Sequence, residues 1–134
     1  MTGKFPGMPR IKLGAVDARD LAQAHLQACK VEEAKNQRFI ISAESLWFRD
    51  IAVILKEEFP RYDIKTNDMS YCLMKIAGCF DSTARMMVKM WDMDMDLNSS
   101  KAKEILGIRY RPIDGSLKEM GHALVESGIV PKKE

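Results

Sequence analysis

The sequence predicts an α/β fold that is mostly helical and has a few short strands. Residues that start and stop helices recur along the chain, from Asp17 near its beginning to Gly128 near its end. Between the first two predicted helices lies Phe39-Ile40-Ile41, an apolar run without polar alternation, which is typical of a strand covered on both faces. This helix–strand–helix order indicates a parallel or mixed sheet.

Composition argues against two classes of partner. The 134 residues suffice for one domain, and 46% apolar with 30% charged side chains is the balance of a soluble globular protein. The 21 basic and 19 acidic residues are spread along the chain, so no one-sided basic face is expected for a nucleic acid. No run approaches the length of about 20 apolar residues that spans a bilayer, so we expect no membrane partner.

The opening residues and the cysteines indicate a cytoplasmic protein. Residues 1–9 lack the apolar core of a signal peptide and are too rich in glycine and proline for a transit helix. Cys29, Cys72 and Cys79 are odd in number and show no paired spacing, so the simplest interpretation is three reduced thiols. We expect Cys72 and Cys79 to be core residues.

Residues 1–15 are predicted to form an irregular arm, because glycines and prolines interrupt them repeatedly. Asp17 can cap the helix that follows, and Asp20 completes a capping-box-like pair three residues later. One broad face of this helix carries small apolar residues, as in a helix pressed against a sheet; that face includes Leu21, Ala24 and Ala28.

Residues 16–60 are predicted to form a helix–strand–helix unit around the strand at 39–41. Ser45 is placed to cap the second helix, and Phe59-Pro60 ends it. The apolar stripe of this helix consists of Trp47, Ile51, Ile54 and Leu55.

Residues 61–134 are predicted to be a mostly helical remainder. Two helical segments are expected between Met69 and Trp91, and they meet near Gly78 and Asp81. A short helix is expected from Asn98 to Gly107. The last helix is expected to begin at the capping box Ser116-Leu-Lys-Glu119 and to end at Gly128.

The predicted strand at 39–41 lacks neighbours within the chain. Such a strand needs partners on both edges and cover on both faces. The other strand candidates are few: Leu13–Val16, Tyr62–Ile64 and Ile108–Tyr110. We therefore expect the missing strands to come from elsewhere, such as a partner chain that completes the sheet.

Several segments form an ordered series that spans almost the whole chain. They are Gly3–Arg10, Val16-Asp-Ala-Arg-Asp20 with the helix to His25, Gln37–Ser42, the helix ending Glu58-Phe-Pro60, Leu97–Gly107, Tyr110-Arg-Pro112 and a terminal amphipathic helix. In this order they resemble the C-terminal part of the extended short-chain dehydrogenase/reductases, above all the dihydroflavonol-4-reductase-like branch of the NAD-dependent epimerase/dehydratase superfamily.

The resemblance implies the C-terminal portion of a Rossmann-type NAD(P)-binding fold without its N-terminal dinucleotide-binding half. In that family a doubly wound domain carries NADP or NAD, and a smaller C-terminal region covers a small-molecule substrate. By resemblance, residues 38–42 are a late strand of the nucleotide-binding sheet, and residues 3–15 and 62–112 belong to the substrate-covering part. Residues 1–134 are therefore predicted to be a single substrate-covering region, with the catalytic half upstream of Met1.

No catalytic or cofactor-binding residue is predicted within the chain. The eight glycines include no cluster able to wrap a pyrophosphate at a helix N-terminus. Tyr71 and Lys75 have the spacing of the family's catalytic Tyr-x-x-x-Lys pair, but they follow the segment at residues 16–20, which that pair precedes in the family. Tyr71 is interpreted as a half-buried helix residue. We expect no NAD or NADP to bind this chain alone.

No metal ligand is predicted either. Asp92-Met-Asp-Met-Asp96 resembles a calcium loop, but an EF-hand needs glycine at its sixth position and glutamate at its twelfth, which here are Leu97 and Lys103. The alternation suits an extended edge with one wet face instead. His25 and His122 have no partner at ligand spacing.

The sequence thus predicts a portion of an NAD(P)H-dependent oxidoreductase that reduces a carbonyl or oxidises an alcohol on a medium-sized apolar substrate, inactive as this chain alone. The substrate-contact candidates are Met8, Pro9 and Arg10, by their position in the resembling loop. The methionines clustered at 69–95 fit either core packing or an adaptable apolar pocket. The alternative is a non-catalytic interaction protein, a shortened paralogue that completes its sheet with a partner chain.

Overall fold

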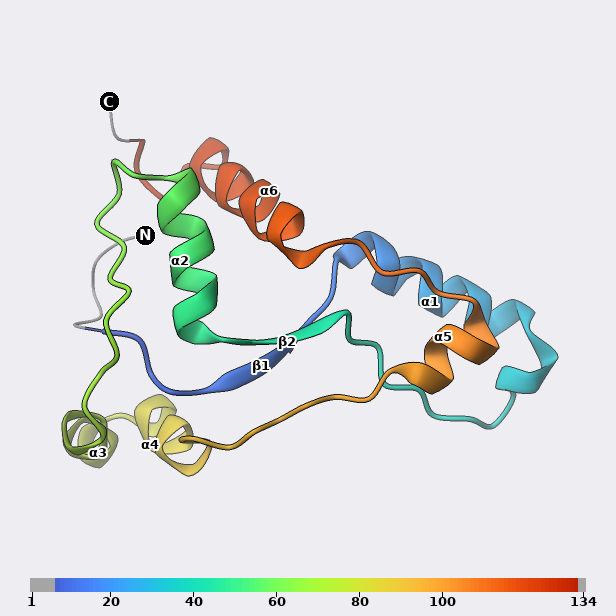
Figure 1. The fold of residues 1–134 in the computed structure, drawn as a ribbon, viewed down its shortest axis with the longest axis horizontal. Helices are drawn as coiled ribbons and strands as arrows, with labels where there is room; N and C mark the ends of the chain where they lie inside the picture. Colours follow the sequence, from blue (N-terminus) through green and yellow to red (C-terminus); the bar gives the residue numbers. More distant parts are fainter. Residues whose placement is uncertain (1–6, 133–134) are drawn as a thin grey trace. The chain divides into compact units, whose positions relative to one another are not determined.

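A computed structural model describes residues 7–132 (Figure 1). Its elements are β1 (Lys12–Ala15), α1 (Ala18–Lys30), a 3-10 turn (Glu32–Ala34), β2 (Glu44–Trp47), α2 (Phe48–Glu58), α3 (Tyr71–Phe80), α4 (Ser82–Lys89), α5 (Ser100–Leu106) and α6 (Ile113–Glu126). The chain divides into two compact units. The first unit comprises the residues up to Leu13, Leu46–Asp94 and those from Leu117; the second unit comprises Gly14–Ser45 and Met95–Ser116.

β1 and β2 form a two-stranded sheet, and β1 confirms the predicted strand near Leu13–Val16. The strands are antiparallel, because Ala43 N donates to Ala15 O at 2.8 Å and Phe48 N donates to Ile11 O at 3.0 Å. The prediction that Ser45 caps a helix is wrong. Residues 44–47 pair with β1 instead, and the Ser45 hydroxyl accepts a hydrogen bond from Leu97 N.

The second unit packs α1 against α5 around small side chains. Ala24 on α1 is 2% exposed and Ala102 on α5 is fully buried, so the predicted small-residue face of the first helix is in the core at Ala24, while Ala28 stays exposed. The buried cluster consists of Ala24, Ala34, Ala102, Leu106 and Ile108.

Residues 39–41, predicted to form a strand, pair with no strand among the residues that the structure describes. Phe39 and Ile41 pack against the core of the second unit, whereas Ile40 is 49% exposed. The predicted strands at 62–64 and 108–110 are also irregular. Their apolar character reflects burial, since Ile64 and Ile108 are core residues.

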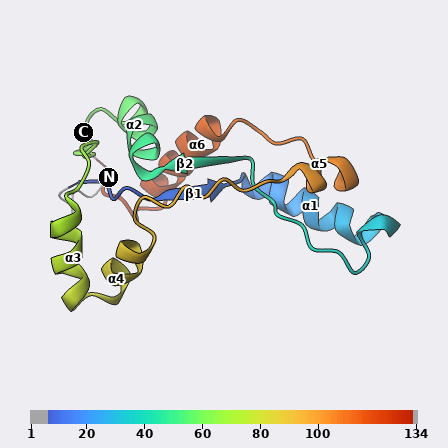
Figure 2. The same cartoon turned by 60° about the horizontal axis from the view of Figure 1, so that its bottom comes forward.

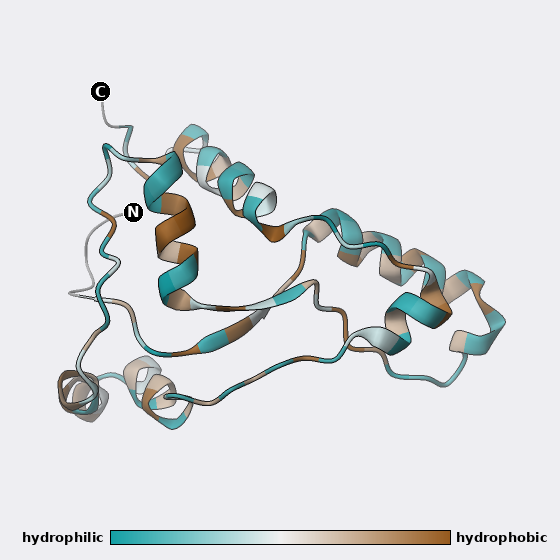
Figure 3. Cartoon of the chain, viewed as in Figure 1, coloured by the Kyte–Doolittle hydropathy of each residue, from teal (hydrophilic) through white to brown (hydrophobic). Residues whose placement is uncertain are grey.

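The first unit contains α2, α3, α4 and most of α6. Hydrophobic residues line one part of α2 (Figure 3), which ends at Glu58, before the proline, as predicted. The core cluster of the first unit consists of Ala52, Phe59, Tyr62, Ile64 and Val130. The Tyr62 hydroxyl donates to Pro131 O at 3.1 Å and so ties the residues after α6 to this core.

Several helix ends follow the predicted chemistry. α3 and α4 meet at Asp81, whose carboxylate accepts from Thr83 N at 2.8 Å. Gly107 ends α5 with a φ of 65°, a left-handed conformation that glycine adopts without a steric penalty. The predicted capping box at Ser116 is wrong: α6 begins at Ile113, and Ser116 lies within it.

The prediction that Cys72 and Cys79 are core residues is wrong. Cys29, Cys72 and Cys79 are free and exposed. In α3 the buried face is taken by Met74 and Gly78, which lie about half a turn away from the two cysteines of that helix. Tyr71 is 44% exposed and contacts the Trp91 ring at a centroid distance of 5.4 Å.

Candidate functional site

Pro9 and Arg10, two of the three substrate-contact candidates, line a cleft of about 300 Å³ in the first unit. Its other lining residues come from the end of β2, from the first turn of α2 and from the loop before α3: Trp47, Arg49, Asp50 and Asp68. Sequence reasoning missed these four. Nothing in the local sequence joins residues 47–50 to residue 68, because the cleft arises from pairing between distant segments.

Two backbone hydrogen bonds hold the segment with Pro9 and Arg10 in place. Met8 N donates to Asn67 O, and Met69 N donates to Met8 O, both at 2.8 Å. The absence of a side chain at Gly7 permits this approach, because a Cβ there would lie 3.0 Å from the Asn67 backbone oxygen. Met8 is not among the described residues that line the cleft; its side chain packs against the core cluster of the first unit.

Ion pairs order the charged side chains in and around the cleft. Arg10 pairs with Asp92 at 2.9 Å, Arg49 with Asp68 at 3.6 Å, and Lys12 with Asp94 at 2.6 Å. Two of the alternating aspartates, Asp92 and Asp94, therefore have basic partners. No group of three potential ligands able to hold a metal occurs within residues 7–132. The guanidinium groups can donate hydrogen bonds to a carbonyl or hydroxyl oxygen.

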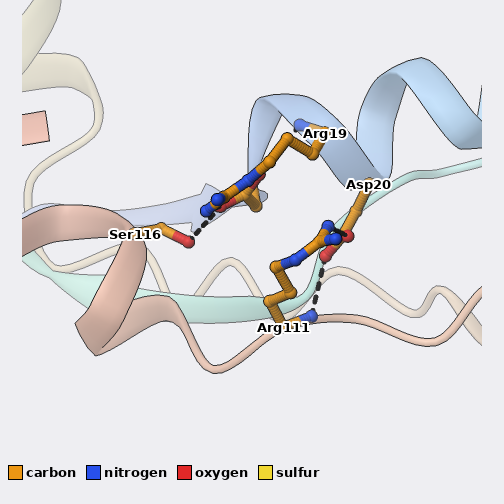
Figure 4. Close-up of polar contacts among 5 residues, drawn as sticks. Arg19, Asp20, Arg111 and Ser116 are labelled. Carbon is orange, nitrogen blue, oxygen red and sulfur yellow. Dashed lines mark hydrogen bonds and ion pairs between the residues drawn. The ribbon is translucent and has the colours of Figure 1, made fainter. Parts of the chain in front are cut away.

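Two buried aspartates at the start of α1 form a second polar cluster (Figure 4). Asp17 caps the helix, as predicted, by accepting from Arg19 N at 2.8 Å. Its other oxygen accepts from Arg19 Nη2 at 2.7 Å and from Ser116 Oγ at 2.5 Å. These hydrogen bonds, that of the Arg19 side chain first, hold the Asp17 pKa well below its usual range.

Asp20 does not complete a capping box. Its carboxylate is 3% exposed and accepts from Arg111 N at 2.7 Å and from the Arg111 guanidinium (Figure 4). The helix start is thus fixed to the segment before α6 by charged hydrogen bonds. The residues that the sequence assigned to a local motif instead join distant parts of the second unit.

The N-terminus of α1 is occupied by a carboxylate of the protein itself. A pyrophosphate binds at a helix N-terminus opened by glycines. Here the N-terminus of α1 already holds the Asp17 carboxylate, and Asp20 adds a second negative charge in the same turn. Both carboxylates are paired with arginines, Arg19 and Arg111, and no helix within residues 7–132 follows a glycine cluster.

Acid should weaken the fold through Asp17. Because its pKa is lower in the folded protein than the value of about 3.9 in an unfolded chain, its stabilising effect is complete above pH 4 and is lost as pH falls towards the folded pKa. Glu58, whose pKa is lowered chiefly by the hydrogen bond from His122, acts in the same direction. We expect the urea midpoint to fall more steeply below pH 4 in the unsubstituted protein than in Asp17→Asn. Glu104→Gln should keep the steep fall, and equal slopes in all three proteins would contradict the assignment.

Tyr71 and Lys75 lie on α3, and no hydrogen bond or ring contact joins them. A ring nitrogen of each histidine lies close to an oxygen of the protein. His25 Nδ1 lies 2.8 Å from Leu21 O, and His122 Nε2 lies 3.0 Å from Glu58 Oε1.

No helix among the described residues is long and apolar enough to cross a membrane. No family model matches the chain. The chain is 25% identical over 121 residues to the NADPH-dependent methylglyoxal reductase GRE2 of Saccharomyces cerevisiae, a match that covers 89% of the chain and 31% of that protein.

Solved structures give a corresponding match. The crystal structure of Gre2 from Candida albicans has a TM-score of 0.65 at 23% identity, covering 94% of this chain and 35% of that one. The yeast methylglyoxal/isovaleraldehyde reductase Gre2, solved with NADPH, has a TM-score of 0.62 at 22% identity, covering 95% of this chain and 38% of that one. The predicted fold class is confirmed: the chain has the fold of part of a Rossmann-type reductase, mostly helical with two short strands, and spans about a third of the length of these relatives.

Proposed function

We propose that this chain is the substrate-covering part of a cytoplasmic NAD(P)H-dependent oxidoreductase of the extended short-chain type, in its dihydroflavonol-reductase-like branch. The match of nearly the whole chain to about a third of Gre2 carries this proposal. The enzyme reduces a carbonyl or oxidises an alcohol on a medium-sized apolar substrate. NADP or NAD is held by polypeptide outside these residues, because the N-terminus of α1 is filled by Asp17.

In this enzyme the cleft around Arg10 contacts the substrate. Arg10 and Arg49 present guanidinium donors, and Pro9 and Trp47 present apolar surface beside them. Such a lining can orient an oxygen-bearing apolar molecule. It holds no group that can donate a hydride to a carbonyl or accept one from an alcohol, so the reaction requires the cofactor-binding portion. Met8 acts through the backbone pairing that positions Pro9 and Arg10.

The test is the intact mass and cofactor dependence of the endogenous protein, captured with an antibody against an exposed α1 peptide. We expect a mass well above 15.2 kDa and NADPH oxidation with an apolar ketone or aldehyde. A mass of 15.2 kDa with neither carbonyl-dependent NADPH oxidation nor an associated chain would refute the proposal.

One observation favours a second candidate function, a non-catalytic interaction protein that completes its sheet with a partner chain. Residues 39–41 pair with no strand within residues 7–132, and Ile40 is half exposed. An unpaired backbone segment of this kind can accept a further strand. Recovery of the short form bound to another polypeptide, without reductase activity, would support this alternative over the first proposal.

Arg10→Met should raise the KM of the captured enzyme for its carbonyl substrate by about tenfold while kcat changes by less than about twofold, because a binding hydrogen bond is lost and the chemistry is not. Arg61→Met, a substitution of an exposed arginine outside the cleft, is the matched control and should leave both constants unchanged. Steady-state kinetics with NADPH decide the question. An unchanged KM in Arg10→Met would remove Arg10 from the substrate contacts.

A further inference from the structure

We propose that the first unit contains a binding site for the aryl or branched alkyl group of a neutral small molecule, in a cavity of about 210 Å³ between α3 and α4. The apolar walls are formed by Met69, Leu73, Met74, Ala77, Ala84 and Met87. This site is separate from the cleft around Arg10, since the two share no lining residue.

The cavity lies beside a tight helix contact, so it does not result from loose packing. α3 and α4 lie side by side in both views (Figures 1 and 2). A Cβ at Gly78 would lie 3.2 Å from Arg85 Cα, and Arg85 Nε donates to Gly78 O at 3.0 Å. Next to this crossing, Ala77 and Ala84 carry only a methyl group each, which leaves the space open.

The walls indicate the chemistry of the ligand. Met74 is 2% exposed and Met69 is 7% exposed, and methionine side chains adjust easily to an apolar guest. At one end lie Thr83 and Asp81, but the Asp81 carboxylate already caps α4. No basic side chain among residues 7–132 lines the cavity, so an anion would lose its hydration without gaining a partner from them. The site therefore selects a neutral group.

The volume sets the size of that group. An apolar cavity of about 150 Å³ holds benzene. The present cavity accommodates one aromatic ring with a short substituent, or a branched chain of similar bulk. Access is provided at Leu73, which lines the cavity and is 47% exposed; α3 carries many hydrophobic residues (Figure 3).

Binding itself depends only on residues of the first unit. The identification of the ligand as the carbonyl substrate, with its apolar group in this cavity, rests on the proposed function. The test therefore measures binding without NADPH or turnover, so that a failure of the cavity and a failure of the reductase proposal remain distinguishable.

The experiment is a titration of the full 134-residue chain with acetophenone, followed by NMR of its methionine methyl groups. We expect saturable shifts at Met69, Met74 and Met87 and none at Met120, which lies on α6. Benzoate, a charged molecule of similar size, should bind at least about tenfold more weakly. A Met74 methyl group without a dispersed resonance would show that the cavity is not formed, and this result or unsaturable shifts would overturn the proposal.

A second experiment uses substitutions that fill the cavity with a larger side chain. Ala84→Leu should weaken acetophenone binding by about tenfold or more, and Ala77→Leu provides the same test at a more exposed position. Ala123→Leu, on the exposed face of α6, is the matched control and should bind as the unsubstituted chain does. Met87→Ala should enlarge the cavity and shift preference towards the larger 2-acetonaphthone. Unweakened binding in both filled variants would overturn the assignment.

Discussion

Replacing Asp20 with alanine is expected to destabilise the protein by about 2–3 kcal/mol, the largest effect that we predict, because two charge-assisted hydrogen bonds are lost at once. Asp20 is 2% exposed, and its carboxylate accepts from both the backbone and the guanidinium of Arg111. The loss would be larger if the unpaired Arg111 guanidinium were fully buried, but this side chain is 46% exposed and water can hydrate it. Urea unfolding at pH 7 measures the change.

Two further variants separate the charge from the hydrogen bonds. Asp20→Asn keeps an acceptor for Arg111 N but removes the charge, so its loss of stability should fall between zero and that of the alanine variant. Glu104→Ala, an exposed acidic residue on α5, should change stability by less than about 0.5 kcal/mol. An alanine variant at Asp20 as stable as the Glu104 control would show that the Arg111 contact contributes nothing.

The sequence predicted the parts of the fold that depend on local chemistry. Asp17, Asp81 and Gly107 mark helix ends as expected, because a cap interacts with backbone only two to four residues away. Asp20 and Ser116 were assigned by the same local rule and are misassigned. Their partners lie 91 and 99 residues away in the sequence, and a pattern over three residues carries no information about them.

The candidate site shows the same division. Pro9 and Arg10 were placed by resemblance to a known loop. Asp68 joins the cleft because Met8 pairs with the backbone on either side of it, and Arg49 joins because the neighbouring Phe48 N donates to Ile11 O. Residues 39–41 illustrate the opposite case. Their composition is that of a buried strand, but strand pairing requires a neighbour that residues 7–132 do not supply.

Gly121→Ala should destabilise the protein by about 1–2 kcal/mol although alanine is the better helix former. Gly121 lies in α6 against α2, and a Cβ there would lie 2.4 Å from Phe59 Cε2 and 3.3 Å from Leu55 Cδ2. Phe59 cannot easily move aside, because its ring is in contact with Tyr62 at a centroid distance of 5.9 Å and with His122 at 4.7 Å. The overpacking therefore outweighs the gain in helix propensity, and the midpoint of thermal unfolding should fall.

The same substitution at Gly115 is the matched control, because it adds the same methyl group to the same helix. Apart from the neighbouring backbone of α6 itself, no atom of residues 7–132 lies within 4 Å of a Cβ at Gly115. Gly115→Ala therefore changes helix propensity alone and should stabilise the protein by about 0.5 kcal/mol. The two variants are thus expected to move the thermal midpoint in opposite directions. If both substitutions raised the thermal midpoint, the Phe59 ring would have to move aside at no cost in stability. The close contact of Gly121 with Phe59 and Leu55 would then not limit the size of the side chain at position 121.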